Sequence, residues 1–265
     1  MKKVILSIFI LVVFSCRTNN STKVDNNIAD AFEIHKNLPP NFNIPPQLTE
    51  YYSGVNFSDN ESLYNELAIL TIAKHTNFLY YSERHQYLYN IDEDPTNTNN
   101  VILMYSSESR SKNEYTSNKN THKFQTFNTE HVYPQSKIEN TAKGDLHHLR
   151  VCDSKINSRR NNHPFTDGSG ESKLIDRNSW YPGDEWKGDV ARMVMYLNIR
   201  YNEPFNEVGS IELFLKWNAE DPISKFEERR NNLIEKTQGN RNPFIDNPYL
   251  ATLIWGGEKA ENKWN

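Results

Sequence analysis

The stretch of sequence that decides the fold runs Phe127-Asn128-Thr129-Glu130-His131-Val132-Tyr133-Pro134. Its aromatic and β-branched residues favour an extended strand, and Pro134 favours a turn at the end of that strand. A second strand is predicted over residues 144–150, and Asp153 can cap a short helix over residues 153–162. A strand, a strand and a helix in this order bring Glu130, His131 and Asn157 together around one point.

Helices are predicted on both sides of this middle segment. Asp59 or Asn60 can cap a helix whose apolar residues recur at helical spacing, and Ser224 with Glu227 forms a capping box for a later one. The other predicted elements are a buried strand over 101–105, a loop over 106–122, and helices over 190–201, 211–217 and 247–255. This pattern is α+β, with a small strand-containing core embedded in a mainly helical single domain.

The composition excludes several classes of protein. The chain has 265 residues, with 30 Lys and Arg against 34 Asp and Glu, so its net charge is −4. A chain of this charge does not hold nucleic acid by bulk positive charge, although a local basic surface is compatible with it. An aromatic content of 12% excludes a disordered chain, and two cysteines exclude a scaffold stapled by disulfides.

Histidines and basic residues concentrate in the middle of this acidic chain. Five of the eight histidines lie within residues 121–163, at positions 122, 131, 147, 148 and 163. The same segment holds seven lysines and arginines against four aspartates and glutamates. A histidine-rich, locally basic segment indicates an anionic substrate that is processed by acid–base chemistry.

Phosphodiester hydrolysis needs the residue types that this segment supplies. The attacking water must lose a proton, and histidine is the usual base near neutral pH, which indicates His131. Negative charge builds on the phosphoryl oxygens, and a hard divalent cation can stabilise it. Mg²⁺ prefers oxygen ligands and keeps several waters, so the Glu130 carboxylate and the Asn157 amide oxygen are sufficient protein ligands.

Three blocks in this segment resemble the bacterial endonuclease I family. They are Thr-Glu-His-Val-Tyr-Pro (129–134), Gly-Asp-Leu-His-His-Leu (144–149) and Lys-Ile-Asn-Ser-Arg-Arg-Asn-Asn (155–162). The resemblance continues through residues 187–196, residues 238–246 and the final Pro-Tyr-Leu segment, and so covers roughly residues 50–256. The family implies a non-specific nuclease with a ββα-metal (His-Me finger) active site.

By motif, His131 matches the general base of the family, and Glu130 and Asn157 match the ligands of one Mg²⁺ ion, for which other divalent cations can substitute. The resemblance implies cleavage of DNA, with RNA left open, to 5′-phosphate and 3′-hydroxyl ends by a monomer. Arg159 and Arg160 are the first candidates for the arginine that contacts the cleaved phosphate, and Arg150 is the next candidate. Exported members of the enterobacterial type carry several disulfides, which this chain cannot form.

Other residues of the segment have structural interpretations. His147 and His148 face opposite sides of their predicted strand, so at most one can approach the metal, and a supporting role is expected for both. Asp189 and Arg192 are expected to form a structural ion pair on one helix. Residues 238–246 are read as a turn held by side-chain amides, with contact to a DNA backbone as the alternative.

Two functions of other classes compete with the nuclease. A zinc hydrolase could use His131, His147 or His148 with Cys152, but no His-x-x-x-His or Cys-x-x-Cys pair is present. An exported lipoprotein rich in Tyr and Trp could instead bind polysaccharide, which leaves the histidine-rich basic segment unexplained. Incubation with plasmid, with and without EDTA and Mg²⁺, separates the three.

The N-terminus indicates export. Lys2 and Lys3 precede an apolar run over residues 4–14, which is too short to span a bilayer comfortably and suits a signal peptide over residues 1–15. Ser15 followed by Cys16 resembles a lipobox, so a lipid anchor on Cys16 is predicted, with an ordinary cleaved signal peptide as the alternative. The predicted location is periplasmic, anchored to the outer membrane, or extracellular.

Three further segments follow this signal. Residues 16–47 are read as a polar tether, 48–258 as the nuclease domain and 259–265 as a tail. If Cys16 is acylated, Cys152 is the remaining thiol, and it is read as a small buried apolar residue.

Overall fold

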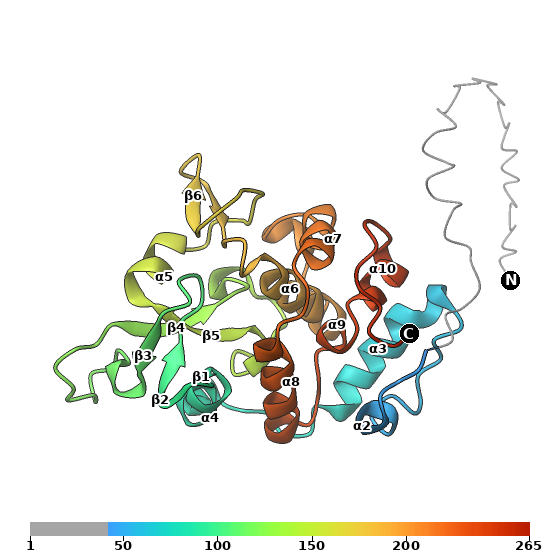
Figure 1. The fold of residues 1–265 in the computed structure, drawn as a ribbon, viewed down its shortest axis with the longest axis horizontal. Coiled ribbons are helices and arrows are strands. Elements are labelled where there is room, and N and C mark those ends of the chain that lie inside the picture. The colour runs from blue at the N-terminus through green and yellow to red at the C-terminus, as the bar shows by residue number, and fades with distance from the viewer. Residues whose placement is uncertain (1–41) are drawn as a thin grey trace, which may run out of the picture. The chain divides into compact units, whose positions relative to one another are not determined.

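The computed structural model describes residues 42–265. The predicted signal peptide, Cys16 and most of the predicted tether lie outside these residues. The fold is α+β, as the sequence predicts, with small antiparallel sheets on one side of the domain and most of the helices on the other (Figure 1). Within residues 42–265, no helix is long and apolar enough to cross a membrane.

Most helices lie toward the two ends of the described chain, and the strands lie between them. The helices are α2 (Pro46–Thr49), α3 (Asn60–Lys74), α4 (Arg84–Ile91), α5 (Ser154–Arg160), α6 (Lys187–Tyr201), α7 (Ile211–Glu220), α8 (Lys225–Gln238), α9 (Pro243–Asp246) and α10 (Tyr249–Trp255). The strands are β1 (Glu93–Asp94), β2 (Asn97–Ile102), β3 (Ser109–Ser111), β4 (Phe127–His131), β5 (Leu149–Asp153), β6 (Lys173–Ile175) and β7 (Ser179–Tyr181).

A strand–strand–helix unit forms the centre of the fold. Strands β4 and β5 pair antiparallel, in a register that sets Glu130 opposite Arg150 and His131 opposite Leu149. Helix α5 follows β5 directly, and the Asp153 side chain caps it by accepting the N–H groups of Lys155 and Ile156. The predicted order of these elements is therefore confirmed.

The second strand begins later than the sequence predicts. Residues 146–148 form η4 (Leu146–His148), a turn of 3-10 helix, because the Asp145 side chain accepts the N–H of His147 at 2.9 Å and caps that turn. The prediction of a strand over 144–150 is thus wrong before Leu149. The inference that His147 and His148 face opposite sides of a strand is wrong for the same reason.

The buried strand predicted over 101–105 lies earlier in the chain than expected. It is β2, which begins at Asn97 and ends at Ile102, and beyond it Met104 makes an isolated parallel bridge to Cys152. The predicted loop over 106–122 contains the short strand β3, which pairs with β2. Cys152 is fully buried, as its interpretation as a small apolar residue requires.

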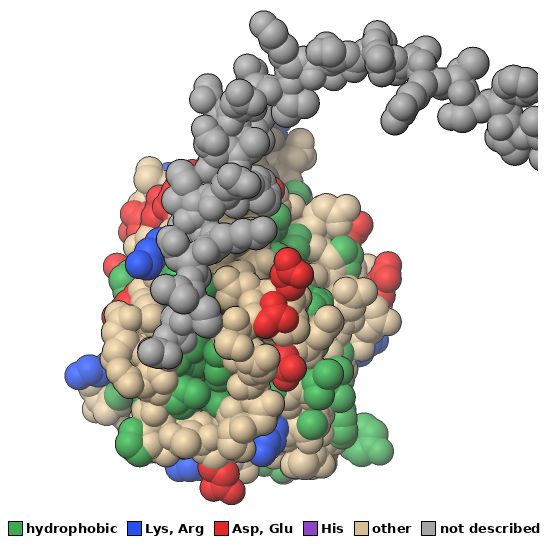
Figure 2. Space-filling model, turned by 90° about the vertical axis from the view of Figure 1, so that its right-hand side faces the viewer, with side chains coloured by type: hydrophobic (Ala, Val, Ile, Leu, Met, Phe, Trp, Pro, Cys, Tyr) green, Lys and Arg blue, Asp and Glu red, His purple; other side chains and the backbone are tan. Residues whose placement is uncertain are grey.

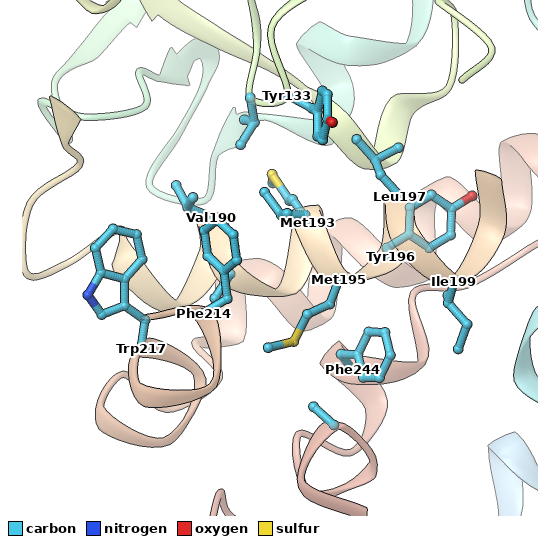
Figure 3. Packing of buried hydrophobic residues seen from close by; sticks show 14 of the residues in the cluster. Tyr133, Val190, Met193, Met195, Tyr196, Leu197, Ile199, Phe214, Trp217 and Phe244 are labelled. Atoms are coloured by element: carbon cyan, nitrogen blue, oxygen red, sulfur yellow. The ribbon is translucent and has the colours of Figure 1, made fainter. Parts of the chain in front are cut away.

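Helix α6 is the central helix of the hydrophobic core. Its apolar residues fall on more than one face, so it packs on both sides. In Figure 3, Met193 points toward Tyr133 after the end of β4, whereas Met195 points to the other side of α6, the side on which Phe244 of α9 lies. Because α6 packs directly behind the β4–β5 unit, the helical half of the domain fixes the position of that unit.

Both ends of the described chain pack on this core. Trp264 is fully buried, and Phe42 contacts it edge-on at 5.3 Å between ring centroids. The N–H of Asn43 also donates to the Trp264 carbonyl at 2.8 Å. Residues on either side of the predicted 48–258 domain therefore contribute to its packing.

The predicted capping box of Ser224 and Glu227 is confirmed, and the predicted ion pair of Asp189 and Arg192 is present but long. Ser210 caps α7, and Ser224 with Glu227 forms the capping box of α8. Arg192 does not pair mainly with Asp189, from which its Nη2 lies 3.9 Å away. Its Nε and Nη2 donate instead to the two carboxylate oxygens of Glu227, at 2.7 and 2.8 Å.

Candidate active site

His131 is the last residue of β4 and lies where the strand ends. Its Nε2 is buried and has no hydrogen-bond partner among the described residues, whereas Nδ1 is not sealed from solvent. Burial, together with the electrostatic effects of His148, Arg84 and Lys143, lowers the pKa of His131 to about 3. The imidazole is therefore neutral near pH 7 and has a nitrogen available to accept a proton.

Two aromatic side chains pack on the His131 ring. Tyr81 lies 5.0 Å from it between ring centroids, and His148 lies 5.5 Å from it. The guanidinium of Arg84 sits 3.8 Å from the centroid of Tyr81. Arg84 also donates from Nε to the Thr129 hydroxyl at 3.0 Å and from Nη1 to the Tyr81 carbonyl at 2.8 Å. Arg84 thus brings a fixed positive charge to the base, although no motif in the sequence identified it.

Glu130 is buried beside the base, with 3% of its surface exposed. The Tyr105 hydroxyl donates to Glu130 Oε1 at 2.9 Å, and the Arg160 Nε lies 3.2 Å from the same oxygen. Both partners use Oε1, so neither occupies Oε2. Burial raises the pKa of Glu130 to about 7, against the opposing effects of Arg160 and the Tyr105 hydrogen bond.

Asn157, in α5, completes the predicted set. Its Nδ2 donates to Asn128 Oδ1 at 2.7 Å and to the Thr129 carbonyl at 3.2 Å. These two hydrogen bonds fix the orientation of the amide. No described residue donates to its Oδ1, so this oxygen remains available as a ligand.

The three side chains line one open cavity of about 550 Å³. Neighbouring residues of a regular strand face opposite sides, and because β4 ends at His131, both His131 and Glu130 can face this cavity. Lys143, from the loop before η4, also lines the cavity. The cavity therefore combines a neutral imidazole, a carboxylate, an amide oxygen and a lysine.

The candidate arginines do not line this cavity. Arg160 is fully buried, and its guanidinium donates to the carbonyls of Asn161 and Val132 and faces Glu130. Arg159 is exposed and lines a separate cavity of about 570 Å³ along another face of α5. Arg150 is also fully buried, where it pairs with Asp92 at 3.2 Å and with Asp189 at 3.1 Å.

Behind η4, Asp145 anchors the loop that carries Lys143. Its Oδ2 accepts the hydroxyls of Tyr196 and Tyr201 at 2.7 and 2.8 Å, and its Oδ1 accepts Gln238 Nε2 at 3.0 Å. His147 is buried in the same network. The segment 238–246 is likewise mostly buried, which favours the structural interpretation of that motif over contact with DNA.

The oxygen donors suit a hard divalent cation. Within residues 42–265, no group of three or more His, Cys, Asp or Glu side chains could hold a metal ion. Glu130 and Asn157 instead offer one carboxylate and one amide oxygen in one cavity, which fits an ion that keeps most of its waters. The zinc alternative lacks support, because Cys152 is buried beside the Met104 carbonyl and does not line the cavity.

The family model for Endonuclease I matches residues 60–249 of the chain. The chain belongs to the endonuclease I family. It is therefore an endonuclease, and the sequence resemblance is confirmed. The match spans β4, β5 and α5 as well as the helices that support them.

Two kinds of relative resemble this endonuclease. An "Extracellular ribonuclease" of Bacillus subtilis (strain 168) is 40% identical over 233 residues, covering 77% of this chain and 78% of that protein. An "Extracellular deoxyribonuclease" of Aeromonas hydrophila is 32% identical over 117 residues, covering 40% of this chain and 51% of that protein. The similarity to the ribonuclease thus extends over far more of the chain.

Proposed function

We propose that the chain is an exported endonuclease that hydrolyses phosphodiester bonds of RNA and DNA without sequence preference. The observation that carries this proposal is the convergence of His131, Glu130 and Asn157 on one cavity. The longer similarity to an extracellular ribonuclease supports RNA as a substrate beside DNA. Export is supported by the signal-like N-terminus and by the extracellular relatives.

In this proposal His131 Nδ1 accepts the proton of the attacking water. The nitrogen is reachable from solvent, and the ring is held by Tyr81 and His148, so it stays aimed at the cavity. General-base catalysis of this kind contributes about 10²–10⁴-fold to a rate. The water attacks phosphorus and the bond to the 3′-oxygen breaks. The leaving 3′-oxygen takes a proton from solvent water, so the products are 5′-phosphate and 3′-hydroxyl ends.

Glu130 and Asn157 would hold one Mg²⁺, or a substituting divalent cation. When bound, the ion stabilises negative charge on the phosphoryl oxygens and on the leaving oxygen. Arg160 positions the Glu130 carboxylate from the buried side, because two backbone carbonyls hold its guanidinium in place. Lys143 and Arg84 would attract the phosphate chain to the cavity.

A single assay tests this function. Labelled RNA and plasmid DNA are incubated with the purified protein in Mg²⁺ and in EDTA, and the product ends are mapped. The proposal requires internal cleavage of both substrates in Mg²⁺, none in EDTA, and 5′-phosphate ends. Cleavage that persists in EDTA would refute the metal assignment, and 3′-phosphate ends would refute the direction of attack.

We also propose that Cys16 carries a lipid anchor and that the enzyme acts as a monomer. The anchor rests on the resemblance of Ser15-Cys16 to a lipobox. Replacing Cys16 by Ser should then move the protein from the membrane fraction to the soluble fraction, or block its maturation. Wild-type protein that is soluble and lacks an acylated N-terminus would exclude the anchor.

A further inference from the structure

We propose that Tyr80 and Phe78 form a stacking surface for unpaired bases, so that the enzyme acts preferentially on single-stranded RNA or DNA. The inference rests on the proposed nuclease function and adds the structural class of substrate. Tyr80 has 77% of its surface exposed and Phe78 has 59%, and both belong to the segment that leads into Tyr81, which packs on His131.

The segment that carries them borders the cavity at two points. Tyr81, the residue after Tyr80, packs on the His131 ring at 5.0 Å. On the other side, Gly144 packs against Leu79 so closely that an added Cβ would lie 2.1 Å from the Leu79 carbonyl oxygen. Gly144 follows Lys143, which lines the cavity. Residues 78–81 therefore lie between His131 and the backbone next to Lys143.

The backbone at Tyr80 is fixed although its side chain is exposed. The Tyr80 N–H donates to Glu83 Oε2 at 2.8 Å, and the Glu83 N–H donates to the Tyr80 carbonyl at 2.9 Å. This reciprocal pair starts η1 (Tyr81–Glu83), which leads into α4. The exposed ring therefore projects from a defined position, so that ordering it costs little on binding.

The exposed Phe78 ring stacks on a buried histidine. Its ring lies flat on His75, with 4.3 Å between centroids and 13° between planes. His75 is buried, so one face of Phe78 is covered while most of the side chain stays in solvent. A ring supported in this way offers its other face to a stacking partner.

Unpaired bases fit these rings better than a duplex does. In a duplex the base faces are covered by their neighbours, whereas a single strand exposes them to aromatic side chains. The phosphates of such a strand carry negative charge, and Arg84 beside Tyr81 and Lys143 beside Gly144 supply positive charge on the same border. Stacking reads no base sequence, which agrees with a nuclease that has no sequence preference.

The test compares one oligonucleotide sequence, free of self-complementarity, as a single strand and as a duplex. The KM and kcat of wild type, Tyr80→Ala, Phe78→Ala and Tyr80→Phe are measured on both, once with RNA and once with DNA. Either Ala variant should raise KM for the single strand about 5- to 100-fold and leave KM for the duplex within about 2-fold. Tyr80→Phe keeps the ring and should restore single-strand KM.

Phe124→Ala is the matched control. Phe124 is an exposed aromatic residue, at 57%, in the loop before β4, so it lies at the opposite end of that strand from His131. Its loss should leave both KM values unchanged. Thermal unfolding of every variant shows whether truncation disturbs the fold.

Unchanged single-strand KM in folded Tyr80→Ala and Phe78→Ala proteins would overturn the stacking surface, and so would an equal rise for single strand and duplex. If wild type cleaves neither form, the proposed nuclease function itself fails, and this outcome is distinct from the others.

Discussion

At position 131, the environment of one imidazole determines what it can do. Burial and nearby positive charges hold the pKa of His131 well below its usual range, so it is neutral without needing a carboxylate partner. His131→Ala should lower the cleavage rate by about 10²–10⁴-fold while Mg²⁺ and nucleic acid still bind, because neither contact uses the imidazole. Steady-state kinetics and binding anisotropy measure the two effects separately.

His122→Ala is the control for this variant. His122 is exposed in the loop before β4, where its ring bonds the Phe124 carbonyl, far along the strand from the cavity. The His122→Ala variant should cleave nucleic acid at the wild-type rate. A folded His131→Ala protein that cleaves at the wild-type rate would show that another group activates the water.

Glu130 gives a prediction that links pH, metal and stability. Burial raises its pKa from 4.5 to about 7. Between these two pH values and without metal, the Glu130 carboxyl is therefore protonated in the folded protein and ionised in the unfolded chain. The protonated Glu130 side chain therefore stabilises the fold fully below pH 4.5, and this stabilisation is lost as pH rises through about 7. A bound cation replaces the proton, so saturating Mg²⁺ should raise Tm by roughly 5–10 °C at pH 8, and by less at pH 5.5.

Thermal unfolding with Mg²⁺ or EDTA at the two pH values measures this difference. Glu130→Gln is the control, since it removes the titrating group at nearly constant volume. The variant should show the same Tm shift, or none, at both pH values. An equal Mg²⁺ effect at pH 5.5 and pH 8 in wild type would contradict the ligand role of Glu130.

At the scale of elements, a buried ion pair joins α6 to α8. Arg192 and Glu227 are both buried and meet through two hydrogen bonds. Arg192→Leu leaves the Glu227 carboxylate buried without its partner, which should lower the free energy of unfolding by about 3–5 kcal/mol. Urea denaturation measures this loss.

The exposed pair of Lys216 and Asp167 provides the comparison. Because water screens it, Lys216→Leu should cost at most about 1 kcal/mol. If both variants lose the same stability, the α6–α8 pair contributes no more than a surface contact. The double variant Arg192→Leu/Glu227→Leu should recover part of the loss, since no unpaired charge remains buried.

Local signals predicted the elements and the core of the site well. Asp153 capping α5 and Ser224 capping α8 depend on side chains within three residues of the helix start, so the sequence contains the whole interaction. Glu130, His131 and Asn157 were predicted from short contiguous motifs, and the three side chains line one cavity. These features need no knowledge of how distant segments meet.

Long-range contacts were the part that sequence could not supply. Arg84 and Tyr81 lie about fifty residues before His131, and no local pattern marks their approach to it. Arg192 has an acidic neighbour three residues away on its own helix, yet it pairs with Glu227 because packing brings α8 closer. The strand assignment at 144–148 failed because one side chain, Asp145, caps a turn there.

At the scale of the whole molecule, charge is distributed unevenly. The chain has a net charge of −4, and Figure 2 shows a face on which Asp and Glu side chains gather near the middle while Lys and Arg lie mainly at the edge. That face carries α2, α3 and α10 and lies away from the β4–β5 unit (Figure 1). Arg84 and Lys143, which border the cavity, are therefore expected to attract a nucleic acid to it.

This distribution predicts a shallow dependence of binding on salt. Each phosphate neutralised on a single strand contributes about −0.7 to the slope of log K against log salt concentration, so two basic residues give a slope of about −1.4. Lys143→Ala should reduce the slope to about −0.7, because one contact is lost. Lys259→Ala, near the C-terminus where the lysine lies over the Tyr249 ring, should leave it unchanged. Fluorescence anisotropy in EDTA, which prevents cleavage, measures the slope from 50 to 300 mM salt. A slope near −4 would mean that a broad basic surface binds the strand, and the acidic far face could not then direct it to the cavity.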